Sequence, residues 1–269
     1  MTALDDAAER ARATYEAAAD AYDAPANGFW EVHGRRTVEL AGVGPGSRVL
    51  DLPCGSGASA IAAARLGASV VAVDLASRLL ELVRTKAARE DLAVDAVERD
   101  MRATGFADEA FDAVICVHGV FFVPDRPALL RELWRMVAPG GTLAVTTWGP
   151  GVLEPGATAF WAAVGAERPD LVRGFNPWDD LVEPEPLLAL CAEAGIPGAT
   201  AQLEAHEQPL AAPEEWWDVV MGSGFRGTVE QLEPDARERV RAANLAAIAG
   251  LASVHASAVY ARAAKRVPG

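Results

Sequence analysis

The stretch from Arg48 to Asp74 constrains the fold of this chain more than any other part of the sequence. A short apolar run at 49–52 leads into a turn that contains a proline and two glycines, and strong helix formers follow from Ala58 to Leu66. A second apolar run then ends at Asp74. Short apolar runs bounded by turn residues indicate buried strands. Because a strand–turn–helix–strand order is the repeating unit of an open parallel sheet, we predict an α/β protein.

The turn after the first strand is suited to hold a ligand against the backbone. Gly55 and Gly57 lack a Cβ, so the turn can be tight and a ligand can lie directly on the peptide groups. Asp74, at the tip of the second strand, is placed to accept hydrogen bonds from both hydroxyls of a ribose. We therefore predict that this unit binds an adenosine-containing cofactor.

Two classes of cofactor fit the unit. Residues 55–60 match the dinucleotide fingerprint G-x-G-x-x-A, which is a weak signal when it stands alone. Asp51, at the strand tip just before the turn, would face the pyrophosphate of a dinucleotide and repel it. The same carboxylate suits a ligand with positive charge, such as the ammonium of a methionyl group. A nucleotide-dependent dehydrogenase is therefore the less favoured alternative.

At this motif the chain resembles the class I S-adenosylmethionine-dependent methyltransferases, in the small-molecule branch similar to ubiquinone and menaquinone biosynthesis enzymes. Their first motif, an acid followed by alternating glycines, appears here as Asp51-Leu-Pro-Cys-Gly-Ser-Gly57, with Pro53 in place of the first glycine. The run Leu-Leu-Arg-Glu-Leu-Trp-Arg-Met-Val-Ala-Pro-Gly-Gly-Thr-Leu at 129–143 strongly resembles the helix–turn–strand of that family. The resemblance covers roughly residues 22–147, and the remainder follows the family only in the order of its elements.

The order of the expected elements fits a doubly wound, Rossmann-like sheet of seven strands, mostly parallel, with an antiparallel last strand, as in the family that the chain resembles. Helical lid insertions are expected to cover the sheet. A first helix is expected from about Leu4 to Tyr22 and a second ends at about Ala41. After the second strand, the remaining strands are expected at Val94–Glu98, Phe111–Val117, Leu143–Thr147, Ala199–Glu207 and Val254–Arg262.

We expect one methyltransferase-like domain that spans residues 1–269. Within it, residues 1–42 would form an N-terminal helical lid and residues 43–147 the cofactor-binding core. Residues 148–182 and 208–250 would be insertions on the substrate side. The first of these is rich in proline, glycine and aromatic residues, and we expect it to be irregular.

The resemblance implies a set of cofactor-binding residues on the strand tips and turns. Asp100 and Met101 would lie against the adenine, and the carbonyl of Val117 would hold the methionyl ammonium. Tyr22 would belong to the lid. The complete set is Tyr22, Asp51, Pro53, Gly55, Ser56, Gly57, Asp74, Leu75, Asp100, Met101 and Val117.

His118 is the one histidine of the four that follows directly on a strand tip, where an acceptor should meet the methyl group. Its unperturbed pKa near 6.5 suits a general base for a phenol, enol or amine. In the alternative interpretation it shapes the pocket or binds a backbone carbonyl. Aromatic residues would form the remaining substrate wall or, alternatively, pin helices to the core. The expected substrate-binding residues are Phe29, Trp30, His118, Phe122, Trp148 and Trp178.

Charge and composition argue against several partners. Thirty-eight Asp and Glu against 24 Lys and Arg give a formal charge of −14, which argues against nucleic acid or an anionic membrane as a partner. No apolar run is long enough to span a bilayer, and residues 1–6 lack a signal pattern, so we expect a cytoplasmic protein. The three cysteines lack the spacing of metal ligands, and we expect no metal site. A homodimer is left open.

We therefore expect an S-adenosylmethionine-dependent methyltransferase (EC 2.1.1.-). It would act on O, N or C of a small aromatic or polyketide-like acceptor, as in secondary metabolism. The alternative is a protein that binds the cofactor without transferring its methyl group, such as a cyclase or a scaffold, since a fold does not dictate one function.

Overall fold

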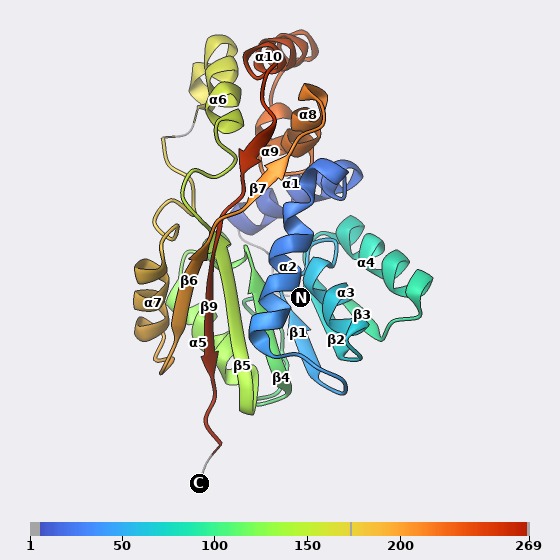
Figure 1. Cartoon of the computed structure of the whole chain (residues 1–269), viewed down its shortest axis with the longest axis vertical. Helices are drawn as coiled ribbons and strands as arrows, with labels where there is room; N and C mark the ends of the chain where they lie inside the picture. The colour runs from blue at the N-terminus through green and yellow to red at the C-terminus, as the bar shows by residue number, and fades with distance from the viewer. Residues whose placement is uncertain (1–5, 173, 268–269) are drawn as a thin grey trace.

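A seven-stranded sheet with the order β3-β2-β1-β4-β5-β9-β6 runs through the computed structural model, which describes residues 6–172 and 174–267 (Figure 1). Strands β1 to β5 pair in parallel, whereas β9 runs antiparallel to both β5 and β6. The predicted fold class is therefore confirmed. The strands are β1 (Arg48–Asp51), β2 (Ser69–Asp74), β3 (Val94–Glu98), β4 (Phe111–Val117), β5 (Val137–Trp148), β6 (Thr200–Glu204) and β9 (Ala258–Ala264).

The parallel register brings the tips of the central strands to one edge of the sheet. Asp51 at the end of β1 is paired with Ile115 of β4, and Asp74 at the end of β2 is paired with Glu98 of β3. Strand β4 is buried on both faces, as expected for a central parallel strand. Residues that lie far apart in the sequence therefore converge beyond this edge, where ligands bind in open α/β sheets.

Helices cover both faces of the sheet. Helices α2 (Phe29–Ala41), α3 (Ala58–Arg65) and α4 (Ser77–Glu90) lie on one face, and α5 (Arg126–Met136) and α7 (Pro184–Glu193) lie on the other (Figure 1). Gly34 lets α2 pack closely on α3, because a Cβ there would come within 2.7 Å of the amide nitrogen of Ser59. The close packing holds α2 against the sheet.

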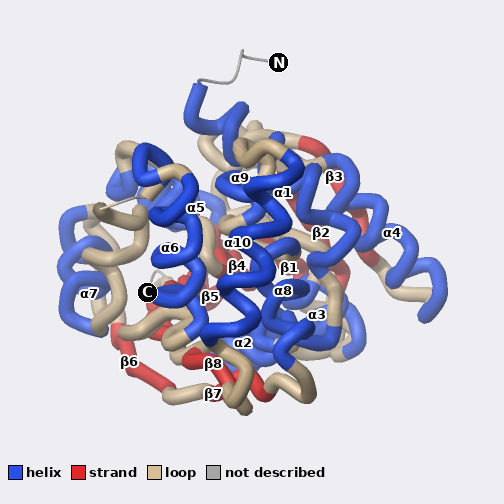
Figure 2. The backbone as a smooth tube through the Cα atoms, turned by 90° about the horizontal axis from the view of Figure 1, so that it is seen from above, coloured by secondary structure: helices blue, strands red, loops and turns tan. Residues whose placement is uncertain are grey.

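A helical cap lies beyond the carboxyl ends of the strands, as the view from above shows (Figure 2). It comprises α1 (Asp6–Tyr22), α6 (Gly156–Glu167), α8 (Pro213–Met221), α9 (Arg226–Val229) and α10 (Pro234–Ala247). A two-stranded antiparallel ribbon of β7 (Glu207–Pro209) and β8 (Ser253–His255) joins the cap to the sheet. Short 3₁₀ helices complete the chain: η1 (Pro25–Asn27), η2 (Val120–Phe122) and η3 (Pro169–Leu171).

Trp216 anchors the interior of the cap. Its side chain is fully buried, and its indole N–H donates a hydrogen bond of 2.7 Å to the buried side-chain oxygen of Asn244 on α10. Gly156 allows α6 to approach, because a Cβ there would lie 2.7 Å from the Trp216 ring. The cap therefore has a packed core of its own, in which the buried indole N–H of Trp216 has a partner.

Two of the predicted strands are each divided in the structure. The expected strand Ala199–Glu207 ends at Glu204 and resumes as β7 at Glu207, and the expected strand Val254–Arg262 is split into β8 and β9. The chain leaves the main sheet at these points and pairs in the ribbon instead. Because the ribbon also buries Gln208 and Val254, the alternation of buried residues continues through both breaks and hides the change of partner.

The first insertion is more regular than predicted, since it contains helix α6. Apolar residues lie all around this helix, so it lacks the one-sided periodicity that marks an amphipathic helix. The first predicted helix was expected to begin near Leu4, which lies outside the described residues. Strand β5 begins at Val137, earlier than predicted, because its pairing with β4 includes an irregularity at the Pro-Gly-Gly turn.

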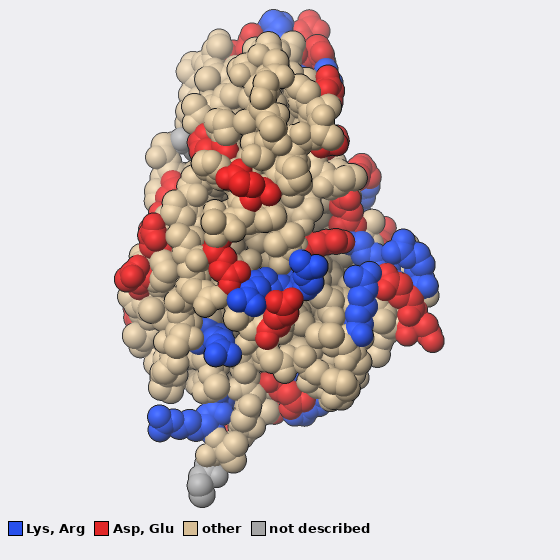
Figure 3. Space-filling model, viewed as in Figure 1, with Lys and Arg blue, Asp and Glu red and all other residues tan. Residues whose placement is uncertain are grey.

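Acidic and basic side chains are interspersed over the face shown in Figure 3, and neither sign forms a continuous field there. Among the described residues, no helix is long and apolar enough to cross a membrane.

Candidate functional site

A cavity of about 490 Å³ lies between the carboxyl edge of the sheet and the cap. The tips of β2, β4 and β5 and the turn after β1 form its floor, and α1, α6 and the segment before α9 form its roof. Fourteen of the predicted site residues line it: Tyr22, Trp30, Pro53, Gly55, Ser56, Asp74, Leu75, Asp100, Met101, Val117, His118, Phe122, Trp148 and Trp178.

The turn after β1 forms a cradle of backbone and carboxylate at one end of the cavity. Gly55 adopts a left-handed conformation with φ of 53°, which favours glycine. Its amide N–H donates to the carboxylate of Asp74 at 2.9 Å, and the amide of Ala76 donates to the other carboxylate oxygen at 2.9 Å. The hydroxyl of Tyr22 lies 2.9 Å from the place of a Cβ on Gly55. A Cβ at this position would press against that hydroxyl, which adds to the backbone preference for glycine.

Asp51 lies beneath the cradle and does not line the cavity. It is 1% exposed, and neither carboxylate oxygen makes a hydrogen bond of ordinary geometry among the described residues. Burial raises the pKa of Asp51 well above its usual range, and the backbone amide of Ala60 opposes this only in part. A buried carboxyl group without a partner is stabilised in its charged form by nearby positive charge. The site therefore favours a cationic ligand over an anionic one.

Asp100 and Met101 follow β3 at the far wall of the cradle. The Asp100 carboxylate is held by the Arg102 guanidinium, with an Nη2–Oδ2 distance of 2.6 Å, and it also accepts from the Arg102 amide at 2.9 Å. Arg102 Nε also donates, at 3.0 Å to each carboxylate oxygen, so a further donor would have to share these oxygens with Arg102 or displace part of the ion pair. The ion pair orients Asp100 beside the cavity.

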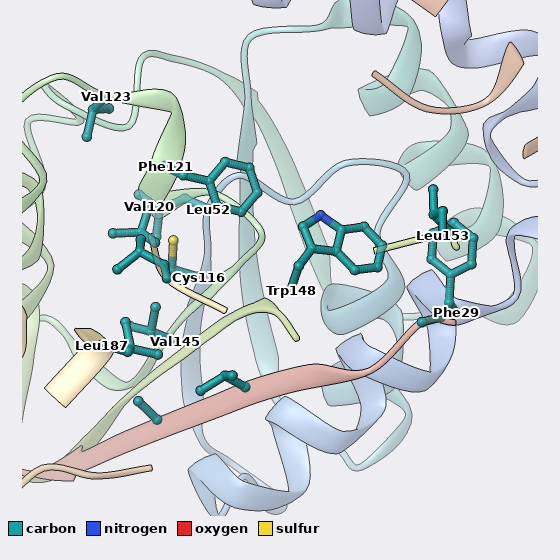
Figure 4. Packing of buried hydrophobic residues seen from close by; sticks show 14 of the residues in the cluster. Phe29, Leu52, Cys116, Val120, Phe121, Val123, Val145, Trp148, Leu153 and Leu187 are labelled. Carbon is teal, nitrogen blue, oxygen red and sulfur yellow. The ribbon is translucent and has the colours of Figure 1, made fainter. Parts of the chain in front are cut away.

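His118 stands at the opposite end of the cavity, directly after β4. Its backbone adopts a left-handed conformation with φ of 52°, which is uncommon outside glycine, and its amide N–H donates to the carbonyl of Thr146 at 2.8 Å. The imidazole stacks on the Trp148 indole, with ring centroids 4.2 Å apart. The Phe29 ring also packs against that indole (Figure 4). Backbone and stacking together hold the His118 ring in one place.

The His118 ring is bonded to a second histidine, which the sequence analysis did not select. His118 Nε2 lies 2.8 Å from Nδ1 of His33, and His33 Nε2 lies 2.7 Å from the carbonyl oxygen of Ala256. His33 lies on α2, one helical turn before the buried Thr37. Two polar residues four apart on the apolar face of a helix were a signal that could have revealed this network.

Burial keeps both imidazoles uncharged near neutral pH. It lowers the pKa of His33 to about 4, an effect that the hydrogen bond to Ala256 partly opposes. It lowers the pKa of His118 well below its ordinary value, and His33 adds to this. His118 therefore retains a lone pair at neutral pH, as a general base requires.

Aromatic side chains form most of the acceptor end. Trp30 stacks on Tyr22, with centroids 5.3 Å apart and planes 4° from parallel. The sequence analysis missed further aromatic residues of the wall because they come from separate elements. These are Tyr15, Phe121, Trp161 and Phe225.

Phe29 and Gly57, both predicted as site residues, do not line the cavity. Phe29 is fully buried behind Trp30 and Trp148. Gly57 has φ of 91°, and a Cβ there would point at Val83, 3.1 Å away, and not at the cavity. Gly57 therefore shapes the turn through its backbone.

Within residues 6–172 and 174–267, no group of three or more His, Cys, Asp or Glu side chains is arranged to hold a metal ion. The three cysteines, Cys54, Cys116 and Cys191, are buried free thiols.

Comparisons with known proteins show which sequences this chain is similar to. The sequence model of a family described as a methyltransferase domain matches residues 50–145. An uncharacterized protein of Mycobacterium tuberculosis is 44% identical over 111 residues, which are 41% of this chain and only 40% of that relative's length. A ubiquinone biosynthesis O-methyltransferase of Xanthomonas campestris is 34% identical over 214 residues, covering 73% of this chain and 84% of that protein.

Solved structures share the fold. The YcgJ protein of Bacillus subtilis has a TM-score of 0.55 at 16% identity and covers 88% of this chain and all of that one. The [4+2]-cyclase SpnF has a TM-score of 0.55 at 18% identity, over 88% of this chain and 81% of that one. At these identities the likeness concerns the fold alone.

Proposed function

This chain belongs to the class I S-adenosylmethionine-dependent methyltransferases, and on that premise we propose that it methylates a hydroxyl group of a small, flat, aromatic or polyketide-like acceptor. One observation carries the proposal: a neutral histidine and an aromatic wall share a single cavity with the Gly55–Asp74 cradle. A cofactor and an acceptor can therefore meet without crossing bulk water.

The cradle residues fit this cofactor. S-adenosylmethionine, when bound, supplies an electrophilic methyl group on a sulfonium. Asp74 would accept from the ribose hydroxyls and Asp100 from the adenine amino group. The orphaned carboxylate of Asp51, with the carbonyl of Val117, would favour the positively charged methionyl end. A dinucleotide would instead place its pyrophosphate above Asp51, which is unfavourable.

The aromatic wall selects the acceptor. Trp30, Trp148 and Trp178 offer flat apolar surfaces, and ligand pockets of this kind bind apolar bodies with few polar anchors. The wall also holds the acceptor in line with the methyl carbon. By excluding water, it prevents hydrolysis of the cofactor. We propose that α1, α6 and the neighbouring cap helices act as the lid.

His118 would take the proton of the acceptor. When the acceptor oxygen receives the methyl group, its O–H proton would pass to the free nitrogen of His118, and S-adenosylhomocysteine would be the leaving group. That nitrogen, Nδ1, is buried and has no hydrogen-bond partner among the described residues, so acceptor binding must uncover it. Catalytic hydrogen bonds often form only in the substrate complex.

Transfer to oxygen is favoured over transfer to nitrogen or carbon by two observations. The relatives from Xanthomonas are named ubiquinone biosynthesis O-methyltransferases. In addition, a hydroxyl must lose its proton during attack, whereas an electron-rich carbon or a neutral amine attacks without a base. A buried neutral histidine serves the former chemistry.

The test combines binding and turnover. Calorimetry with S-adenosylhomocysteine should show binding, with NAD as the negative control. Isotopically labelled cofactor and a panel of phenols and enols, read by mass spectrometry, should then show methyl incorporation. Binding without incorporation into any acceptor would favour a non-methylating protein. Failure to bind S-adenosylhomocysteine would overturn the proposal.

A further inference from the structure

His33 has both ring nitrogens engaged inside the protein. It is fully buried, with Nε2 at 2.7 Å from the carbonyl oxygen of Ala256 and Nδ1 at 2.8 Å from Nε2 of His118. A carbonyl oxygen only accepts hydrogen bonds. The proton of the neutral His33 ring therefore lies on Nε2.

The position of that proton determines the tautomer of His118. A neutral imidazole carries one N–H, so Nδ1 of His33 has a lone pair and can only accept. The 2.8 Å contact is a hydrogen bond only if His118 Nε2 carries the proton. His118 Nδ1 is then left with the lone pair, and it is the ring nitrogen that has no hydrogen-bond partner among residues 6–172 and 174–267.

The groups that face the two rings favour their neutral forms. From α2 the neighbours are Phe29 and Trp30, and from β5 the neighbour is Trp148. From the β6–β7 connection His206 lies with its ring centroid 6.1 Å from that of His33, and from β9 Tyr260 lies at 6.3 Å. None of the hydrogen bonds that the described residues make to either ring comes from a carboxylate.

A buried hydrogen-bond network fixes the positions of the His33 and His118 rings relative to each other. Thr37 Oγ1 donates to the carbonyl of His33 at 2.7 Å and bonds Thr146 Oγ1 at 2.7 Å. The carbonyl of Thr146 accepts from the amide of His118 at 2.8 Å. Helix α2 is thereby joined to the tips of β4 and β5 at the point where the two imidazoles meet.

We propose that His33 is a positioning residue that fixes His118 in the tautomer protonated on Nε2, so that Nδ1 is the nitrogen presented as the base. This inference rests on the proposed role of His118 in methyl transfer. When Nδ1 takes the acceptor proton, both nitrogens of His118 carry protons, and the Nε2–H bond to His33 persists. The added proton leaves to solvent with product release.

Two variants separate the hydrogen bond from mere packing. In His33→Phe the ring volume is kept but the acceptor is lost. In His33→Asn the side-chain oxygen lies near the former Nδ1 and can still accept from His118 Nε2. His206→Asn is the matched control, since it changes a neighbouring histidine that has no bond to His118.

The first readout needs no acceptor molecule. ¹⁵N NMR of histidine-labelled protein distinguishes protonated from bare ring nitrogens. At neutral pH the wild type, His33→Asn and His206→Asn should show His118 protonated on Nε2. The His33→Phe variant should show a mixture or the opposite tautomer. An unchanged His118 tautomer in His33→Phe would overturn the proposal.

The second readout is kinetic. His33→Phe should lower kcat by about 10–100-fold with KM and the affinity for S-adenosylhomocysteine nearly unchanged, and His33→Asn should recover most of the loss. An equal loss in both variants would assign His33 a merely structural role and overturn the proposal. If the wild type methylates no acceptor, the proposed function fails, while the tautomer measured by NMR still supports or overturns the role of His33.

Discussion

Glu16 on α1 caps helix α4, because its carboxylate accepts a hydrogen bond of 2.6 Å from the backbone amide of Ser77. It also accepts from the Ser77 hydroxyl at 3.0 Å and from the Arg78 amide at 3.3 Å. The residue in the N-cap position of α4 is Ala76, which has no side chain able to cap. The N-terminal cap of α4 is thus supplied by a side chain of α1, and this contact fastens α1 to the segment that carries Asp74.

Removing the Glu16 carboxylate, which caps helix α4, should loosen the lid. Glu16→Ala should lower the free energy of unfolding by about 0.5–2 kcal/mol, as for other helix caps. It should also increase hydrogen exchange in α1 and speed release of S-adenosylhomocysteine. Glu9→Ala is the control, since Glu9 lies on the same helix and pairs with the exposed Arg12. Equal exchange in α1 for the two variants would contradict a fastening role for Glu16.

Asp74 has two tasks that one substitution can test together. Its oxygens hold the amides of Gly55 and Ala76, and we propose that they also accept from a ribose. Asp74→Asn should weaken S-adenosylhomocysteine binding by about tens- to hundreds-fold, which corresponds to roughly 2–3 kcal/mol. Calorimetry measures this change. Asp112→Asn is the control, because Asp112 lies near the start of β4, at the sheet edge opposite to the cavity, and pairs with Arg48. Wild-type affinity would remove Asp74 from the site.

Gly119 is required by the proline that replaces the first glycine of the motif. A Cβ on Gly119 would lie 2.1 Å from Cδ of Pro53 and 2.8 Å from Sγ of Cys116. Gly119→Ala should therefore displace the turn, lowering the free energy of unfolding by roughly 1–3 kcal/mol together with cofactor affinity. Gly44→Ala is the matched control, because a Cβ there meets nothing within 4 Å. Urea denaturation with equal midpoints for both variants would show that the turn adapts.

The stability of the fold should fall on acidification through the buried histidine pair. The pKa of His33 is lowered to about 4, against roughly 6.5 in the unfolded chain. Below the unfolded value only the unfolded state gains the proton, so stability present above about pH 6.5 is lost as pH falls toward 4. The loss from His33 is about 2–3 kcal/mol. Urea midpoints across this range should fall less steeply for His33→Asn, and an identical slope would contradict the assignment.

The cradle could be predicted because its parts are local in sequence. Asp51, Gly55 and Asp74 lie within one strand–turn–helix–strand unit, and parallel pairing alone brings them together. His118 followed in the same way from its position after a strand. The position of each such residue follows from the end of its strand, and an apolar run in the sequence marks where that strand ends.

The remaining parts depend on contacts between distant segments. His33 meets His118 across 85 positions, and Glu16 meets Ser77 across 61. Phe29 and Trp30 are neighbours on a helix and point about 100° apart, so only the orientation of α2 decides which one faces the cavity. The burial of His33 and Thr37 sets that orientation, and the sequence alone does not show that these two polar residues face inward.

The pH dependence of turnover tests His118 most directly. Burial and the neighbouring His33 lower the pKa of His118, so its base form predominates across the neutral range. Turnover of the wild type should therefore stay level as pH falls through about 6.5, where an unperturbed histidine would lose activity. His118→Phe keeps the ring against Trp148 but removes the base, and it should lower kcat by about 10²–10⁴ with little change in cofactor affinity.

The loss in His118→Phe should shrink as pH rises, because an acceptor that ionises unaided no longer needs the imidazole. His206→Asn serves as the control, since His206 lies outside the cavity wall, and it should follow the wild-type profile. If His118→Phe also matches wild type in both height and shape, His118 is not the base. The acceptor would then be a group that attacks without losing a proton, such as an electron-rich carbon or a neutral amine.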